Sequence, residues 1–215
     1  MSNAHEITLA FENALCDYTG APLAVATTSC TQAILMALAW YNEKYKEPIA
    51  IGPGEFAHLL KPPVSMPKLS YVGVPASVRN AGFDVVFRDE DWQGEYQLNP
   101  LPVWDSARRF TSGMYRRGAM QCVSFHWSKI LGLSQGGAIL LDDMDAYLWL
   151  LKARFDGRTP GIDAKHDQVT YPSWHAYLSP EVAAHGLMKL SLLPQHNADL
   201  PRSDYPDLST LEAFK

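Results

Sequence analysis

The feature that most constrains the fold is an alternation of short apolar runs with segments of helical spacing along the 215-residue chain. Five runs have strand-like composition: LAVATT (23–28), FDVVFRD (83–89), LPVWD (101–105), QCVSFHW (121–127) and AILLDD (138–143). Apolar spacing and stop signals predict helices over 5–18, 32–45, 144–157 and 179–193, and a turn followed by a helix within 71–81. Strands that alternate with helices favour a layered α/β sheet.

The segments between these elements carry turn residues. Residues 46–67 are rich in Pro and Gly, which predicts a loop with at most one short element. Residues 90–100 are polar and turn-like, 158–173 are expected to be loop, and the last twenty residues to be a surface tail with one helical turn. Ser179 followed by Pro180 is typical of a helix start.

Composition narrows the class of protein. A hydrophobic fraction of 47% with 19% charged residues excludes a disordered or fibrous chain. With 18 Lys and Arg and a net charge of −5, no basic field indicates nucleic-acid binding. Three widely spaced cysteines form neither a disulfide framework nor a metal pair, and no other metal-ligand spacing is present. No apolar run approaches ~20 residues and no signal peptide begins the chain, so we expect a cytoplasmic protein without a membrane anchor.

Polar residues follow the expected strands or precede the expected helices at four places. These are Ser29-Cys30-Thr31, Ser70-Tyr71, Asp105 and the segment 124–129. Each has an ordinary structural explanation, because Ser and Thr often cap helices, Asp often forms turns, and Lys is often solvated. In an α/β sheet, however, polar residues at the carboxyl ends of strands line the usual ligand crevice.

Together the four places suit one cofactor. The turn at Ser29–Thr31 opens a helix and could bind a phosphate through free N–H groups. Asp105 could pair with a protonated ring nitrogen, Lys129 could form a Schiff base, and Tyr71 could cover the face of a flat heterocycle. Phosphate, pyridinium, aldehyde and aromatic face are the four features of pyridoxal 5′-phosphate (PLP).

The same residues lie in stretches that resemble a known family. FENALCDYTGAPLAVATTSCTQAILMAL (11–38), MPKLSYVGVPASVRNAGFDVVFRDED (66–91), VWDSARRF (103–110) and VSFHWSKILGLSQGGAILLDD (123–143) resemble the large domain of the DegT-type sugar aminotransferases, which are fold type I PLP enzymes. The stretches occur in family order. The resemblance implies a three-layer α/β/α fold with a mixed, mostly parallel sheet.

The resemblance also implies a role for each matching residue. Lys129 would be the Schiff-base lysine that moves the proton, Asp105 would pair with the pyridine nitrogen, and Tyr71 would stack on the ring. A family branch that dehydrates sugars has histidine in place of this lysine, so Lys129 favours transamination.

Five further positions complete the implied cofactor site. Thr31, the backbone of Gln32 and Ser124 would bind the phosphate. Cys30 stands where the family has a small residue, and Arg108 stands where it has Gln or His near the phenolic oxygen.

The chain departs from the family in two respects. Only about a dozen residues join the strands 83–89 and 101–105, where relatives have a further strand, and we expect the chain to lack the C-terminal small domain of the family. We therefore expect a reduced PLP-binding large domain over 1–193 and a C-terminal tail over 194–215. His175 is the nearest counterpart of an Asn that in relatives reaches the phosphate of the other subunit.

The expected function is transfer of an amino group from glutamate to a nucleotide-linked keto sugar by a PLP-dependent homodimer. Two alternatives stay open. The chain could be a reduced PLP-binding or partner subunit, or a PLP enzyme of another reaction type, such as a decarboxylase or lyase, because the pocket and not the fold selects the bond that reacts.

Overall fold

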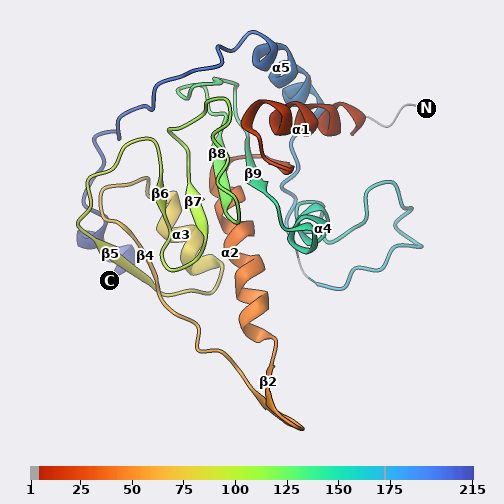
Figure 1. Cartoon of the computed structure of the whole chain (residues 1–215), viewed down its shortest axis with the longest axis vertical. Coiled ribbons are helices and arrows are strands. Elements are labelled where there is room, and N and C mark those ends of the chain that lie inside the picture. Colours follow the sequence, from red (N-terminus) through yellow and green to blue (C-terminus); the bar gives the residue numbers. More distant parts are fainter. Residues whose placement is uncertain (1–4, 172) are drawn as a thin grey trace.

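The computed structural model describes residues 5–171 and 173–215 (Figure 1). Two parts of the chain lie outside the described residues. They are residues 1–4, where the sequence predicts no signal peptide, and residue 172, which belongs to the expected loop 158–173. The elements are α1 (Glu6–Thr19), β1 (Leu23–Thr27), α2 (Cys30–Lys46), β2 (Ile49–Gly52), β3 (Glu55–Ala57), β4 (Val64–Pro67), α3 (Gly73–Asn80), β5 (Val85–Arg88), β6 (Tyr96–Gln97), β7 (Val103–Asp105), β8 (Met120–Ser124), β9 (Gly137–Leu141), α4 (Met144–Ala153), α5 (Pro180–Ser191) and the 3-10 turns η1 (Leu208–Thr210) and η2 (Glu212–Phe214).

A five-stranded mixed sheet in the order β1-β9-β8-β7-β6 forms the centre of the fold. β1, β7 and β8 run in one direction and β9 and β6 in the other, so only the β7–β8 pair is parallel. Parallel pairing is thus rarer than expected. β6 reaches β7 through only residues 98–102, and so short a connection forces an antiparallel return. β4 and β5 pair parallel in a separate sheet.

Helices cover both faces of the central sheet, which confirms the three layers (Figure 1). α2 packs against β1, β7, β8 and β9 and is flanked by α3 and α4, whereas α1 packs against α5 and β1. Alternate residues of β9 enter two different cores: Ile139 and Leu141 face α2, and Ala138 and Leu140 face α1 and α5. A strand buried on both faces is apolar throughout, which is why β9 has so clear a sequence signal.

Side chains define where the helices begin. The Ser29 hydroxyl accepts the Gln32 N–H, so α2 starts at Cys30, two residues earlier than expected. The expected start of α5 is confirmed, because the Ser179 hydroxyl accepts the Val182 N–H and Pro180 occupies the first turn.

The prediction of at most one short element within 46–67 was wrong. β2 and β3 form an antiparallel hairpin with Gly54 at φ +80° in its turn, and β4 follows (Figure 1). The hairpin pairs mainly with itself and projects from the body, so its strands lack the apolar alternation of a core strand. β6 likewise lies inside the segment 90–100 that was expected to be a turn.

The C-terminal segment is held tightly against the body. Leu208 in η1 is fully buried, and its N–H donates to the Lys68 carbonyl at 3.0 Å. The Phe214 and Phe87 rings meet edge to face, with centroids 6.1 Å apart. The expected helical turn is present as η1 and η2, but the segment is more than a surface tail.

Candidate active site

A cavity of about 310 Å³ lies where β1, β7 and β8 end. These three strands run in the same direction, so their carboxyl ends meet at one edge of the sheet. The predicted site residues that line the cavity are Cys30, Thr31, Tyr71, Asp105, Arg108, Ser124 and Lys129. The four polar places found in the sequence are therefore neighbours in space.

The first turn of α2 borders one side of this cavity through Ser29, Cys30 and Thr31. β9 approaches this turn so closely that a Cβ on Gly137 would lie 2.4 Å from the Cys30 nitrogen. Gln32 does not line the cavity, and its N–H already donates to the Ser29 hydroxyl at 3.1 Å. The helix dipole and the hydroxyl of Thr31 make this side suitable for an anion.

Asp105 ends β7 and is only 5% exposed. Its Oδ1 accepts the Ala107 N–H at 3.0 Å, and its Oδ2 accepts the Tyr96 hydroxyl at 2.7 Å. Tyr96 lies opposite Asp105 in the β6–β7 pair and is fully buried. Sequence reasoning missed Tyr96, because β6 is two residues long and offers no periodicity.

Burial raises the pKa of the Asp105 carboxyl above its usual range. The hydrogen bonds from Tyr96 and Ala107 and the positive charges of Lys129 and Arg108 act in the opposite direction. Across the described residues, no cation forms an ion pair with this carboxylate. A protonated ring nitrogen placed here would supply the missing positive charge.

The Cys30 thiol lies beside Asp105, with Sγ 4.0 Å from Oδ1. Burial, reinforced by the negative charge of Asp105, raises the pKa of Cys30 well above its usual range. A neutral thiol is a poor nucleophile, so Cys30 acts as a small side chain in the turn.

Lys129 lies in the turn that follows β8, where its N–H donates to the His126 carbonyl at 2.8 Å. Its side chain is half-buried and borders the cavity. Within residues 5–171 and 173–215 the ammonium group makes no hydrogen bond or ion pair. It is thus available to a ligand while its charge acts on Asp105.

Tyr71 stands just before α3 and is 54% exposed. A Cβ on Gly73 would lie 2.8 Å from its ring and 3.1 Å from the Thr31 methyl carbon, so glycine makes room for the ring next to the first turn of α2. The aromatic face therefore lies at the open side of the cavity.

Arg108 lines the cavity, but its guanidinium is bound by the C-terminal segment. It donates to the Pro201 carbonyl at 2.5 Å and to the Ser203 hydroxyl. Ser203 and Tyr205 also line the cavity, and no sequence signal marked either of them. His175 lies outside the cavity lining, where its Nδ1 pairs with the Asp156 carboxylate at 2.7 Å.

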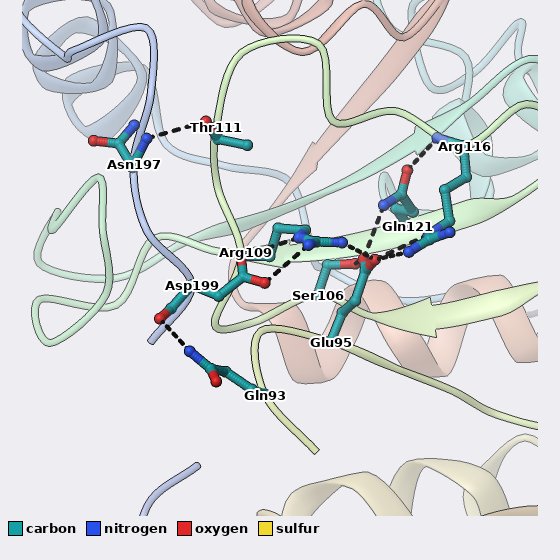
Figure 2. A network of polar contacts seen from close by, with 9 residues as sticks. All are labelled: Gln93, Glu95, Ser106, Arg109, Thr111, Arg116, Gln121, Asn197 and Asp199. Carbon is teal, nitrogen blue, oxygen red and sulfur yellow. Dashed lines mark hydrogen bonds and ion pairs between the residues drawn. The ribbon is translucent and has the colours of Figure 1, made fainter. Parts of the chain in front are cut away.

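A second polar centre, the Glu95 network, surrounds the buried Glu95 carboxylate (Figure 2). The Glu95 carboxylate accepts hydrogen bonds from Arg109, Arg116, Ser106 and Gln121. Burial alone would raise the pKa of Glu95, but Ser106 and the two guanidinium groups hold it below its usual range. Sequence reasoning missed this network, because its members are up to 26 residues apart.

The cavity residues fit PLP in chemistry and placement. A helix N-terminus with hydroxyls suits the phosphate, a buried carboxylate without a cation suits the ring nitrogen, and an amine without a partner suits the aldehyde. A cavity of about 310 Å³ is also in the range of small-molecule sites.

Other classes of site find no support in the part of the chain that the structure describes. Its His, Cys, Asp and Glu residues form no group that could hold a metal ion. Among the helices of the same residues, none has the length and apolar character needed to cross a membrane.

Solved structures share this fold. AtS13 from Actinomadura melliaura matches with a TM-score of 0.70 and 17% identity, over 86% of this chain and 59% of that chain. The sugar aminotransferase CalS13 from Micromonospora echinospora matches with a TM-score of 0.65 and 18% identity, over 86% and 60%. Spr1654 from Streptococcus pneumoniae in its PLP form matches with a TM-score of 0.62 and 18% identity, over 87% and 59%. The chain thus spans less than two thirds of the length of these structures.

Sequence comparison identifies the family. No curated protein matches the chain in sequence. The model of the DegT/DnrJ/EryC1/StrS aminotransferase family matches residues 2–114, which is more than half of the chain. This range contains Thr31, Tyr71, Asp105 and Arg108, whereas Lys129 follows it. The chain therefore belongs to the DegT/DnrJ/EryC1/StrS aminotransferase family.

Proposed function

We propose that this protein is a PLP-dependent aminotransferase that moves an amino group from glutamate to a nucleotide-linked keto sugar. The observation that carries the proposal is the arrangement of Lys129, Asp105 and the first turn of α2 around one cavity. The family supports the reaction class, and the name of CalS13 as a sugar aminotransferase supports the substrate class.

In this proposal different residues bind the phosphate and the ring of the cofactor. Thr31 and Ser124 bind the phosphate with the dipole of α2, and the Gln32 N–H joins them only if it leaves the Ser29 hydroxyl. Asp105 binds the ring nitrogen and keeps a proton on it, and Tyr71 covers the ring.

When bound, PLP supplies an aldehyde that captures amines and a conjugated ring that accepts electrons from the neighbouring carbon. Lys129 would hold the cofactor covalently and, once displaced by the amino donor, would be placed to move a proton beside it. Asp105 keeps the ring nitrogen cationic throughout, and Tyr96 fixes the orientation of that carboxylate.

We also propose a homodimer. Tyr71 at the cavity is 54% exposed and Trp127, two residues before Lys129, is 71% exposed. A second copy that covers these rings would remove apolar surface from water and narrow the opening of the cavity. Light scattering of the purified protein, with and without PLP, measures this state directly.

The test of the reaction combines covalent trapping and turnover, on separate portions of the PLP-loaded protein. One portion is reduced with borohydride and its peptides are mapped by mass spectrometry, and the other is left unreduced and mixed with glutamate. The wild type should carry a pyridoxyl group on Lys129, and glutamate should shift the absorbance toward the pyridoxamine form. Lys129→Ala should lose both, whereas Lys152→Ala on α4, away from the cavity, should keep both.

Each contrary result points elsewhere. A protein that does not take up PLP, or a label on another residue, contradicts the proposed site. Label on Lys129 without amine transfer to any keto sugar contradicts the aminotransferase and favours the partner-subunit alternative. Release of CO₂ from an amino acid favours a decarboxylase.

A further inference from the structure

A piece of the C-terminal segment without regular secondary structure borders the cavity. In the stretch 201–207, which we call the wall segment, Ser203 and Tyr205 are half-buried and line the cavity, whereas Asp204 and Pro206 between and after them are exposed. Within the wall segment, Ser203 and Tyr205 are thus the two residues that line the cavity.

The wall segment is anchored before it begins (Figure 2). The Asp199 carboxylate pairs with the Arg109 guanidinium at 2.9 Å, which ties it to the Glu95 network. The Leu200 N–H donates to the Arg108 carbonyl at 2.9 Å, and the Leu200 carbonyl accepts the Gly94 N–H at 3.2 Å. These contacts join the segment to the chain just before β6 and just after β7.

The wall segment is anchored again where it ends. Leu208 is fully buried, and its N–H donates to the Lys68 carbonyl. The Lys68 ammonium lies 3.6 Å from the Asp207 carboxylate. With both ends fixed, the wall segment is a built part of the cavity.

Arg108 connects the wall segment to the site. It follows Asp105 by three positions and donates to Pro201 and Ser203, so the residue that departs from the family pattern is the one that contacts the wall segment. The Ser203 hydroxyl accepts from Arg108, which leaves its own proton for a ligand.

We propose that the wall segment forms the substrate side of the cavity, and that Ser203 and Tyr205 determine its specificity for a hydroxylated sugar ring. The inference rests on the proposed function. A serine hydroxyl and a phenol exchange hydrogen bonds with sugar hydroxyls, and an aromatic face packs against the C–H face of a pyranose. The amino donor and PLP need neither group.

The first experiment uses the protein without cofactor. Cys30 lines the cavity and is 8% exposed, so its alkylation by iodoacetamide reports access to the cavity, and Cys122, fully buried in β8, is the internal reference. The reaction is run in alkaline solution, because burial raises the pKa of the Cys30 thiol and only the thiolate is alkylated. Tyr205→Ala should raise the alkylation rate of Cys30 about fivefold or more, without a change at Cys122. Asp204→Ala, whose side chain is exposed, should leave both rates unchanged. Equal alkylation rates of Cys30 in wild type and Tyr205→Ala would show that the wall segment does not form a side of the cavity.

The second experiment measures specificity in the loaded enzyme with glutamate and a uridine diphosphate-linked 4-keto hexose. Tyr205→Phe and Ser203→Ala should each raise the KM for the keto sugar about tenfold, while the Kd for PLP and the rate of the glutamate half-reaction stay at wild-type values. If the wild type turns over and the two variants have its KM for the keto sugar, the specificity role is wrong and the proposed function still holds. Failure of the wild type to accept an amino group from glutamate would contradict the proposed function. The alkylation rates of Cys30 would still show whether the wall segment limits access to the cavity.

Discussion

The protein has a buried carboxylate, Glu95, just before β6 and another, Asp105, at the end of β7. The surroundings of the two differ sharply. Glu95 accepts hydrogen bonds from two guanidinium groups, an amide and a hydroxyl. Asp105 accepts one from a phenol and one from a backbone N–H. The pKa of Glu95 is lowered, whereas the pKa of Asp105 is raised by burial.

The difference separates structural from functional burial of charge. Glu95 has cations from its own chain, so its charge is stabilised in the folded protein and holds β6, the loop after β7 and the C-terminal segment together. Asp105 lacks a paired cation among the described residues, so its charge costs free energy until a cationic ligand arrives. A carboxylate of this second kind at the edge of a cavity is a mark of a binding site.

The largest expected effect is loss of the reaction in Asp105→Asn. The amide cannot keep a proton on the ring nitrogen, so kcat for transfer from glutamate should fall about a thousandfold, or ~4 kcal/mol. Steady-state kinetics with saturating PLP measures the loss, and circular dichroism checks the fold. Asp84→Asn, an exposed carboxylate away from the cavity, should keep the wild-type rate. An Asp105→Asn enzyme with near-normal kcat would remove Asp105 from the site.

Glu95→Gln should lower the stability of the folded protein and not the rate of the reaction. It leaves Arg109 and Arg116 without their buried counter-charge, so the free energy of unfolding should fall by about 3 kcal/mol in urea denaturation. Glu47→Gln, which breaks a surface pair with Lys44, should change it by less than about 0.5 kcal/mol. Equal small changes in both variants would show that the Glu95 network contributes little to folding.

The two carboxylates should respond to pH with opposite signs. The lowered pKa of Glu95 means that its stabilisation is complete above the ordinary value of 4.5 and is lost as pH falls through the folded pKa. The raised pKa of Asp105 means that ionisation costs stability as pH rises from the ordinary value of 3.8 through the folded pKa.

Denaturation of the cofactor-free variants at several pH values measures both effects. Glu95→Gln should be less stable than wild type at pH 7. The difference should shrink as the pH falls below the pKa of Glu95 in the folded wild type. Asp105→Asn should be at least as stable as wild type at pH 7 and lose that advantage in acid. A common sign for the two variants would contradict the comparison.

The smallest expected effect belongs to Tyr96→Phe. It removes one hydrogen bond from Asp105, so the carboxylate is less well oriented and its pKa rises further. The Kd for PLP should increase about fivefold, or ~1 kcal/mol, in a spectral titration. Tyr115→Phe removes a phenol bond to the Ala119 carbonyl away from the cavity and should leave the Kd unchanged. Equal Kd values for the two variants would show that Tyr96 does not support Asp105.

Local signals in the sequence determined most elements and the cavity residues at strand ends. The doubly buried β9 is a continuous apolar run, and Ser179 with Pro180 marks the start of α5. The polar places around Ser29, Asp105 and Lys129 meet at one cavity, because β1, β7 and β8 run in one direction and end at the same edge. Tyr71, which follows β4 of the separate sheet, lines the same cavity.

What the sequence alone did not reveal depends on partners far along the chain. The β2–β3 hairpin and β6 are too short or too exposed to show periodicity. The bond from Arg108 to Ser203 joins residues 95 positions apart.

Apolar runs and caps carry their information within a few residues, so the layered α/β elements and the chemistry at their ends can be predicted from the residues alone. The pairing of β6 with β7, the hydrogen bond from Tyr96 to Asp105 and the place of Ser203 and Tyr205 in the cavity lining emerge only in the folded chain. Those contacts form when distant segments are packed together, and no local pattern of residues encodes them.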